Sequence, residues 1–166
     1  NAPASFPVGV TNVTWTVTDD AGNLTTCIQV VTIEDNELPS IICPADLTTN
    51  NSSGHCYASG VDLGTPVTND NCGISSVTND APSNIPVGVT TVTWTVVDDN
   101  GNTATCEQTV TITDSENPTI SCPSAVTVST DPGACSATGV SLGTPLTSDN
   151  CNVASTINNA PAEFPV

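Results

Sequence analysis

Lysine and arginine are absent from this chain of 166 residues, whereas aspartate and glutamate together number 17, so the formal net charge is −17. A protein that binds nucleic acid needs basic side chains to contact the phosphates, so their absence excludes nucleic acid as a partner. It equally excludes electrostatic docking to anionic lipid. The charge favours solubility, repulsion between like chains and attraction of cations.

Methionine and long hydrophobic runs are also absent, and aromatic residues make up only 3% of the chain. Because no apolar run is long enough to be a transmembrane segment or a signal peptide, we expect no direct membrane insertion. High net charge with few aromatics is typical of disorder, but only 10% of the residues are charged and β-branched residues are abundant. The first residue is Asn1 rather than methionine, which indicates a mature or excised segment.

The sequence lacks the residues that enzymatic catalysis usually requires. The single histidine, His55, lies in a polar stretch beside Cys56, and alanine stands 79 positions later, at Ala134. No basic side chain is available to stabilise an oxyanion. We therefore predict that the chain is not an enzyme and that His55 is a solvated loop residue.

The chain does contain an internal repeat with a period of 79 residues, and it covers two periods with an overlap of eight residues. The overlap is visible because residues 1–8 read NAPASFPV and residues 159–166 read NAPAEFPV. We therefore expect a longer parent array. The pairs of residues at this offset include Cys27 and Cys106, Cys43 and Cys122, Cys56 and Cys135, Cys72 and Cys151, and Trp15 and Trp94.

Acidic, proline-containing stretches at 32–44 and 111–123 are typical of linkers. They predict three segments: the C-terminal half of one repeat at 1–37, a complete repeat at 38–116 and the N-terminal part of the next repeat at 117–166.

Within the repeat, apolar residues recur with a period of two, which predicts half-buried β-strands. An Asp-Asp-Asn-Gly-Asn turn signal at 98–102 separates two such strands. The fold class is therefore all-β, a tandem array of Ig-like β-sandwich repeats of 79 residues. The residues expected on one face of each strand are Val92, Trp94 and Val96, and Cys106, Val110 and Ile112. We expect Trp15 and Trp94 to be core residues rather than sugar-stacking platforms.

The chain resembles the hyalin repeat (HYR) domain. The residues that carry the resemblance stand in a fixed order: an acidic linker with Pro39, then Cys-Pro, Asp-Asn-Cys, Ile-Pro-Val-Gly, Thr-Val-Thr-Trp-Thr-Val, the turn at 98–102 and Thr-Cys in the last strand. The resemblance implies Ig-like modules of extracellular proteins that are implicated in cell adhesion. Long arrays similar to this one occur in giant bacterial surface proteins. The pair Cys56 and Cys72 is additional to the basic family pattern.

Four cysteines per unit allow three disulfide connectivities. We favour Cys43–Cys106, because it would tie the opening strand of an Ig-like unit to the closing strand and because the family pattern keeps these two cysteines. Cys56–Cys72 and Cys135–Cys151 would then close short loops, and Cys27 and Cys122 would pair outside the segment. Inter-repeat bridges, Cys27–Cys43 and Cys106–Cys122, are an alternative; zinc is disfavoured because CxxC pairs are absent.

Calcium is the one metal that the sequence suggests, because hard oxygen ligands suit Ca²⁺. In an Ig-like unit the linker lies at the same end as the loop between the second and third strands and the last hairpin loop. Ordinary turn residues are the competing interpretation of these acids. The candidate ligands at the first linker are Asp35, Glu37, Asp70, Asp98 and Asp99, and those at the second linker are Asp114, Glu116 and Asp149.

The composition and the resemblance together predict an extracellular structural or adhesive module, a stalk segment of a giant surface adhesin. One alternative is a filament assembled by contacts between chains, and another is an accessory module of a secreted enzyme. The expected partners are neighbouring repeats of the same chain, other array chains or a surface ligand. Eight cysteines favour an oxidising compartment, at the cell surface or outside the cell.

Overall fold

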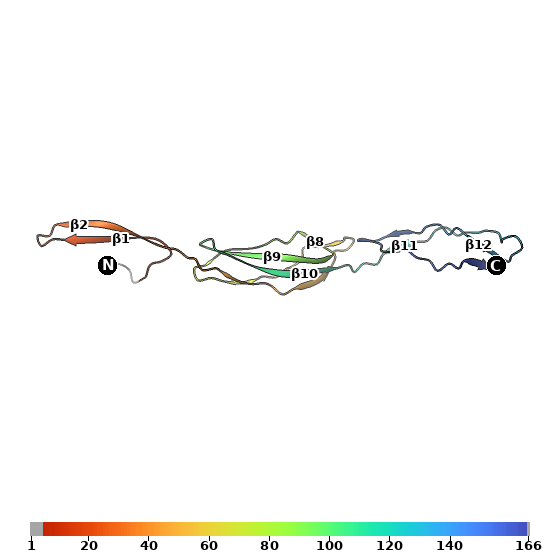
Figure 1. Cartoon of the computed structure of the whole chain (residues 1–166), viewed down its shortest axis with the longest axis horizontal. Helices are drawn as coiled ribbons and strands as arrows, with labels where there is room; N and C mark the ends of the chain where they lie inside the picture. The colour runs from red at the N-terminus through yellow and green to blue at the C-terminus, as the bar shows by residue number, and fades with distance from the viewer. Residues whose placement is uncertain (1–4, 166) are drawn as a thin grey trace. The chain divides into compact units, whose positions relative to one another are not determined.

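The computed structural model describes residues 5–165, and within that range every regular element is a β-strand (Figure 1). The all-β fold class predicted from the sequence is therefore confirmed. No helix capable of crossing a membrane is found among these residues. The chain divides into two compact units. The first contains residues up to 47, 62–82 and 90–110, and the second contains 48–61, 83–89 and the residues from 111 onward.

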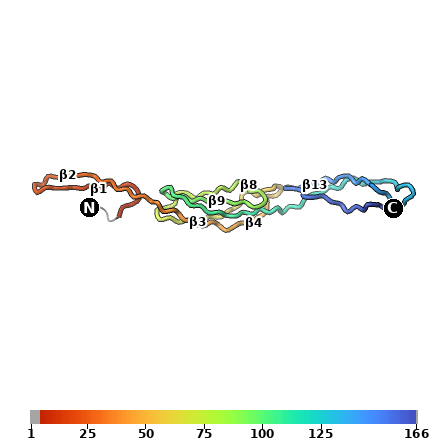
Figure 2. The backbone as a smooth tube through the Cα atoms, in the orientation of Figure 1, coloured from red at the N-terminus to blue at the C-terminus, as the bar shows by residue number. Residues whose placement is uncertain are grey.

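In the first unit, strands β1 (Gly9–Thr18) and β2 (Leu24–Ile33) form an antiparallel hairpin, and Figure 2 lets the reader follow the two strands side by side. Trp15 lies opposite Cys27 in the register. The turn is held by Asp19, whose Oδ1 accepts hydrogen bonds from the backbone N–H groups of Ala21 and Asn23. Gly22 has φ of 87°, a conformation that glycine adopts without strain.

The largest sheet has four strands in the order β4–β10–β9–β7, so the two long strands lie in its centre. Exposed fractions along β9 alternate, with Val92 at 0%, Trp94 at 6% and Val96 at 0%. Val110 and Ile112 on β10 are equally buried. The alternation predicted for these strands is therefore confirmed, and burial of these apolar side chains stabilises the sheet. The strands are β4 (Leu47–Asn50), β7 (Ile74–Asn79), β9 (Gly88–Asp98) and β10 (Thr103–Thr113).

Two-stranded antiparallel sheets complete the fold. In the first unit β3 (Ser40–Ile42) pairs with β6 (Val67–Asn69). In the second unit β5 (Tyr57–Ser59) pairs with β8 (Asn84–Pro86). The other two pairs, also in the second unit, are β11 (Thr119–Ser121) with β13 (Leu146–Ser148) and β12 (Ser136–Thr138) with β14 (Glu163–Pro165).

The 79-residue offset holds for these elements as well as for the sequence. Strand β3 corresponds to β11, β5 to β12, β6 to β13 and β8 to β14, and the paired residues in each sheet match at that offset. The hairpin β1–β2 corresponds to β9–β10. These segments therefore share strand positions and pairing, whereas the counterparts of β4 and β7, at 126–129 and 153–158, form no strand.

Two disulfides are present among the described residues. Cys43–Cys106 joins the segment after β3 to β10, with the Cα atoms 5.8 Å apart, which is the predicted pair. The second joins Cys56 to Cys151, with the Cα atoms 4.7 Å apart and 95 positions between them.

The predicted pairs Cys56–Cys72 and Cys135–Cys151 are therefore wrong in this structure. The prediction treats 56–72 as one short loop, but β5 and β6 belong to different sheets, which carries Cys56 away from Cys72. Cys27, Cys72, Cys122 and Cys135 are exposed and unbonded among residues 5–165. Pairing of Cys27 and Cys122 outside the segment stays a prediction.

Candidate metal centre and linker disulfide

Asp98 is the most buried acidic side chain near the first linker, with 1% of its surface exposed. It ends β9, and its Oδ1 accepts hydrogen bonds from the backbone N–H groups of Asn100 at 2.9 Å and Asn102 at 2.7 Å. Its Oδ2 accepts one from the Asn102 side chain at 2.8 Å. Burial by itself would raise the pKa of Asp98, but the hydrogen bonds from Asn102, Asn100 and Gly101 lower this pKa overall. The buried group is therefore held as a carboxylate.

Asp35 and Asp70 lie next to Asp98, so that one carboxylate oxygen of each residue lies within 4.8 Å of the other two. Asp70 follows β6 and its Oδ2 accepts hydrogen bonds from the N–H groups of Cys72 and Gly73. The linker is tied to the hairpin loop because Asn102 Nδ2 donates to the Asp35 carbonyl oxygen at 3.2 Å. We call Asp35, Asp70 and Asp98 the carboxylate cluster.

Two oxygens of the carboxylate cluster are buried and accept no hydrogen bond, Asp35 Oδ2 and Asp70 Oδ1. Buried polar atoms in proteins are nearly always paired, because an unpaired one forfeits the hydration that it had in water. Here the protein cannot supply a cationic partner from Lys or Arg, since the chain has neither.

Glu37 and Asp99, the other predicted ligands at this linker, are exposed and lie outside the cluster. The Glu37 N–H donates to Asp35 Oδ1, which makes Glu37 part of the turn that positions Asp35. Asp99 is held against Gly73, to whose carbonyl oxygen its N–H donates.

The thiol of Cys72 adjoins the carboxylate cluster. Its pKa is raised above the usual 9.0, first by loss of solvent around the sulfur, and then by the adjacent Asp35 carboxylate and the negative charges of Asp70 and Asp98. The thiolate is disfavoured here because it would add a fourth negative charge.

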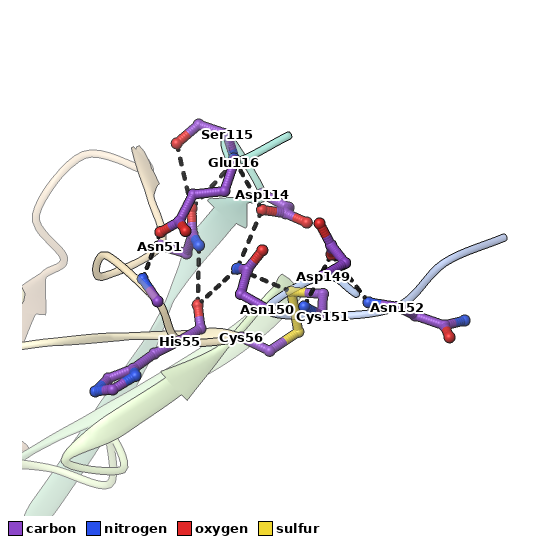
Figure 3. The surroundings of a disulfide bond; sticks show 11 residues. Asn51, His55, Cys56, Asp114, Ser115, Glu116, Asp149, Asn150, Cys151 and Asn152 are labelled. Carbon is purple, nitrogen blue, oxygen red and sulfur yellow. Dashed lines mark hydrogen bonds between the residues drawn. A yellow bond between two sulfur atoms is a disulfide. The ribbon is translucent and has the colours of Figure 1, made fainter. Parts of the chain in front are cut away.

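The second linker, which lies within the second unit, repeats part of this arrangement (Figure 3). Among the described residues Asp114, Glu116 and Asp149 do not form a second group of three close carboxylates. Asp114 and Asp149 stand 79 positions after Asp35 and Asp70. Asp149 Oδ2 accepts hydrogen bonds from the N–H groups of Cys151 and Asn152, while Asp149 Oδ1 is buried and unpaired. The side-chain oxygen of Asn150 is unpaired as well.

Side chains from before β5 hold the second linker in place. Asn51 Oδ1 accepts from both the N–H and the hydroxyl of Ser115, and Glu116 accepts from the Gly54 N–H. Asn150 Nδ2 donates to the His55 carbonyl oxygen at 3.1 Å and to Asp114 Oδ1 at 3.3 Å. The Cys56–Cys151 bond lies beside this network, as Figure 3 shows.

The structure also tests the positions predicted for His55 and the two tryptophans. His55 is exposed and stacks on Tyr57 with ring centroids 4.8 Å apart, in agreement with the loop position expected for it. Trp94 is a core residue, whereas Trp15 is 59% exposed, so the core position expected for both holds for Trp94 only.

The fold and the linkers define a disulfide-bonded β-sheet protein built on a 79-residue repeat. The HYR domain family matches residues 34–112, a segment of the same length as the repeat. The chain is also 36% identical over 126 residues to hyalin from Strongylocentrotus purpuratus, an alignment that covers 66% of this chain and 10% of hyalin. The chain thus spans about a tenth of that relative, and its residues 34–112 are similar to the HYR domain.

Proposed function

We propose that the chain is a structural segment of an extracellular adhesive protein, a non-enzymatic stalk that holds a binding region at a distance from the cell. The HYR domain and the similarity to hyalin support this role. The disulfides support an oxidising location, since such bonds persist outside the cell. The charge of −17 keeps neighbouring stalks apart.

The observation that carries the proposal is the Cys56–Cys151 disulfide. It joins a residue of the predicted repeat 38–116 to a residue of the segment 117–166, across the linker. A stalk must resist extension and bending at its linkers, where a repeat protein otherwise has few contacts. The covalent bond and the hydrogen bonds of Asn51 and Asn150 meet this requirement.

Pulling the oxidised chain by its ends in an optical trap tests the stalk role. With both disulfides intact, tension reaches Cys151 through only the short stretch between Cys43 and Cys56. Replacing Cys56 and Cys151 by serine should release about 32 further residues, roughly 110 Å of contour length. An unchanged length in the variant would mean that the bond carries no load, and the stalk role would lose its main support.

A second function, calcium binding at the carboxylate cluster, is supported by three observations. Three carboxylate oxygens lie within 4.8 Å of one another, two oxygens of the carboxylate cluster are buried and unpaired, and the chain has no lysine or arginine. Ca²⁺ takes six to eight oxygen ligands, and a divalent ion would offset the mutual repulsion of the carboxylates. An ion bound by Asp35 and Asp98 would also bind the linker to the hairpin loop.

Assembly into filaments by contacts between chains is the alternative role, and one observation favours it. The β1–β2 hairpin exposes Val10, Trp15, Val17 and Ile28, each at 59% or more. Exposed apolar faces of this kind mark interaction sites in soluble proteins.

A further inference from the structure

Asp131 and Pro132 form the only Asp–Pro peptide bond in the chain. Acid cleaves this kind of peptide bond readily, for two chemical reasons. The aspartate carboxylate can attack its own main-chain carbonyl carbon to give a cyclic anhydride, an intramolecular reaction between groups that are already adjacent. The nitrogen of proline belongs to a tertiary amide, which is a good leaving group once it gains a proton. The surroundings of the bond therefore decide how it behaves in the folded protein.

The bond lies in a tight turn whose main chain is held by hydrogen bonds. The Asp131 N–H donates to the Ser136 carbonyl oxygen at 2.8 Å, and the Ala134 N–H donates to the Asp131 carbonyl oxygen at 3.0 Å. Gly133, with φ of 80°, allows the chain to reverse its direction without strain. The Ala134 N–H is thus already in place to stabilise the negative charge that develops on the Asp131 carbonyl oxygen during attack.

The carboxylate of Asp131 is anchored through one of its two oxygens. Its Oδ2 accepts hydrogen bonds from the N–H of Thr138 at 2.9 Å and from the Thr138 hydroxyl at 2.8 Å. Among residues 5–165 no hydrogen bond to Asp131 Oδ1 is found, so the lone pairs of this oxygen are free for attack. Asp131 is half-buried and Pro132 is exposed, so water can reach the bond.

The titratable groups around the turn bring no positive charge to it. Glu163 on β14, the strand that pairs with β12, accepts a hydrogen bond from Ser136 Oγ. Cys135 lies in the turn itself and is exposed. Because negative surroundings attract cations, hydronium ions included, the proton that the Pro132 nitrogen needs can come from the solvent. Cleavage should therefore accelerate as the pH falls.

The equivalent turn of the complete repeat has the same geometry without the reactive pair. Ser52 and Ser53 stand 79 positions before Asp131 and its proline. The Ser52 carbonyl oxygen accepts a hydrogen bond from the His55 N–H at 3.0 Å. The Ser52 hydroxyl oxygen accepts one from the Ser59 N–H at 3.1 Å, in the place of the carboxylate oxygen. The chain therefore contains two copies of one turn, and only the second copy has an acid-labile bond.

We propose that the peptide bond between Asp131 and Pro132 is a self-cleavage site, which the folded turn activates in mildly acidic solution. Asp131 Oδ1 attacks its own carbonyl carbon, and the nitrogen of Pro132 leaves with a proton from the solvent. Water then opens the cyclic anhydride to a C-terminal aspartate, so that the net change is the addition of water across the peptide bond. The step occurs once in each chain, and it depends on neither the stalk role nor calcium.

Cleavage at this bond does not by itself release the two products from each other. Cys56 and Cys151 lie on opposite sides of the bond, so their disulfide joins residues 1–131 to residues 132–166. The products stay covalently joined until a reductant breaks this disulfide. The chain thus combines an acid-sensitive backbone bond with a reductant-sensitive cross-link, and release of the C-terminal product requires both acid and reductant.

The full chain tests the proposal once its free thiols have been alkylated. After incubation in mildly acidic buffer it should give one band on a non-reducing gel, and fragments 1–131 and 132–166 on a reducing gel. Mass spectrometry should find a new C-terminus at Asp131 and a new N-terminus at Pro132. A hydrazide probe that is present during the incubation should become attached to Asp131, because it opens the anhydride in place of water.

Variants and unfolding separate the effect of the turn from the general acid lability of an Asp–Pro bond. Asp131→Asn keeps an acceptor oxygen for Thr138 but removes the attacking carboxylate, so the fragments should disappear. Ser52→Asp combined with Ser53→Pro places the reactive pair in the equivalent turn, and this variant should be cleaved at both turns. In urea with reductant, cleavage of the unsubstituted chain at the same pH should be at least about tenfold slower, because the Ala134 donor is no longer in place.

Replacement of Cys56 and Cys151 by serine tests the role of the disulfide, and the fragments of this variant should separate on the non-reducing gel. Recovery of the Cys43–Cys106 peptide from each variant checks that it folds. The proposal would be overturned by the absence of fragments from the unsubstituted chain, by equal cleavage with Asp131→Asn, or by an intact bond at the transplanted pair. Equal rates in the folded and the unfolded chain would also overturn it, because the turn would then contribute nothing.

Discussion

Cys56 is bonded to Cys151, although another cysteine, Cys72, lies much closer to it in the sequence. The bond encloses the acidic linker at 114–118 together with β5 to β13, so part of the loop that it closes is the linker itself. In the unfolded chain such a bond removes the freedom of a long loop, which stabilises the folded state by about 4 kcal/mol in the chain-entropy description.

Calcium binding is best tested with two aspartates that occupy the same kind of turn. Asp98→Asn should abolish the heat of calcium binding in isothermal titration calorimetry, because it removes the buried carboxylate of the cluster. Asp19→Asn should leave the titration unchanged, since Asp19 makes the same turn hydrogen bonds without Asp35 and Asp70 beside it. Calcium should also raise the melting temperature of the unsubstituted chain relative to chelator. No heat and no change in melting temperature would end the calcium proposal.

The core of the four-stranded sheet can be probed at Val110, which is 0% exposed. Val110→Ala should lower the free energy of unfolding by about 1.5–3 kcal/mol, because it removes buried methyl groups and leaves a cavity. The matched change is Val31→Ala, 79 positions earlier on the hairpin, where the side chain is only half-buried. It should cost clearly less in a dilute monomer. Urea titration followed by fluorescence measures both, and equal losses would contradict the burial difference described for the two strands.

The strands were predictable because their signal is local. Alternation of β-branched residues on β9 and β10 indicates which face is buried, whatever the rest of the chain does. The proximity of Asp35, Asp70 and Asp98 was also predictable, because the topology of an Ig-like unit brings their loops to one end. The exclusion of Glu37 and Asp99 was not, since the direction of each side chain depends on turn hydrogen bonds that neighbouring acids share.

The disulfide partner of Cys56 could not be predicted from the sequence, for a different reason. Spacing along the chain favours Cys72, and only the assignment of β5 and β6 to different sheets removes it. The Cys56–Cys151 bond is consistent with the 79-residue repeat. Cys135 is the repeat equivalent of Cys56 and Cys72 is that of Cys151, and both of these are unbonded.

The turn of the hairpin should respond to acid through Asp19. Hydrogen bonds from the side chain and backbone of Asn23, and then from the backbone of Ala21 and Gly22, hold the pKa of Asp19 below its usual 3.8. A lowered pKa means that the turn is stabilised above pH 3.8, and that this contribution is lost as the pH falls through the pKa of the folded state. NMR titration of the Asn23 amide should give a midpoint below 3.8, and Asp19→Asn should remove the titration. A midpoint at or above 3.8 would mean that these bonds do not favour the charged form.

The reactivity of Cys72 reports on the carboxylate cluster. Because loss of solvent and the nearby negative charges of Asp35, Asp70 and Asp98 raise the pKa of this thiol above 9.0, its alkylation by iodoacetamide in chelator should rise only at higher pH than that of a model thiol. Asp35→Asn should move the profile to lower pH, because it removes one of these charges. Glu37→Gln is the matched control, since Glu37 lies outside the cluster, and its profile should not move. Calcium should act in the same direction as Asp35→Asn, because a bound cation favours the thiolate. If the Cys72 profile moves equally with Glu37→Gln and Asp35→Asn, the thiol responds to the net charge of the chain rather than to the cluster.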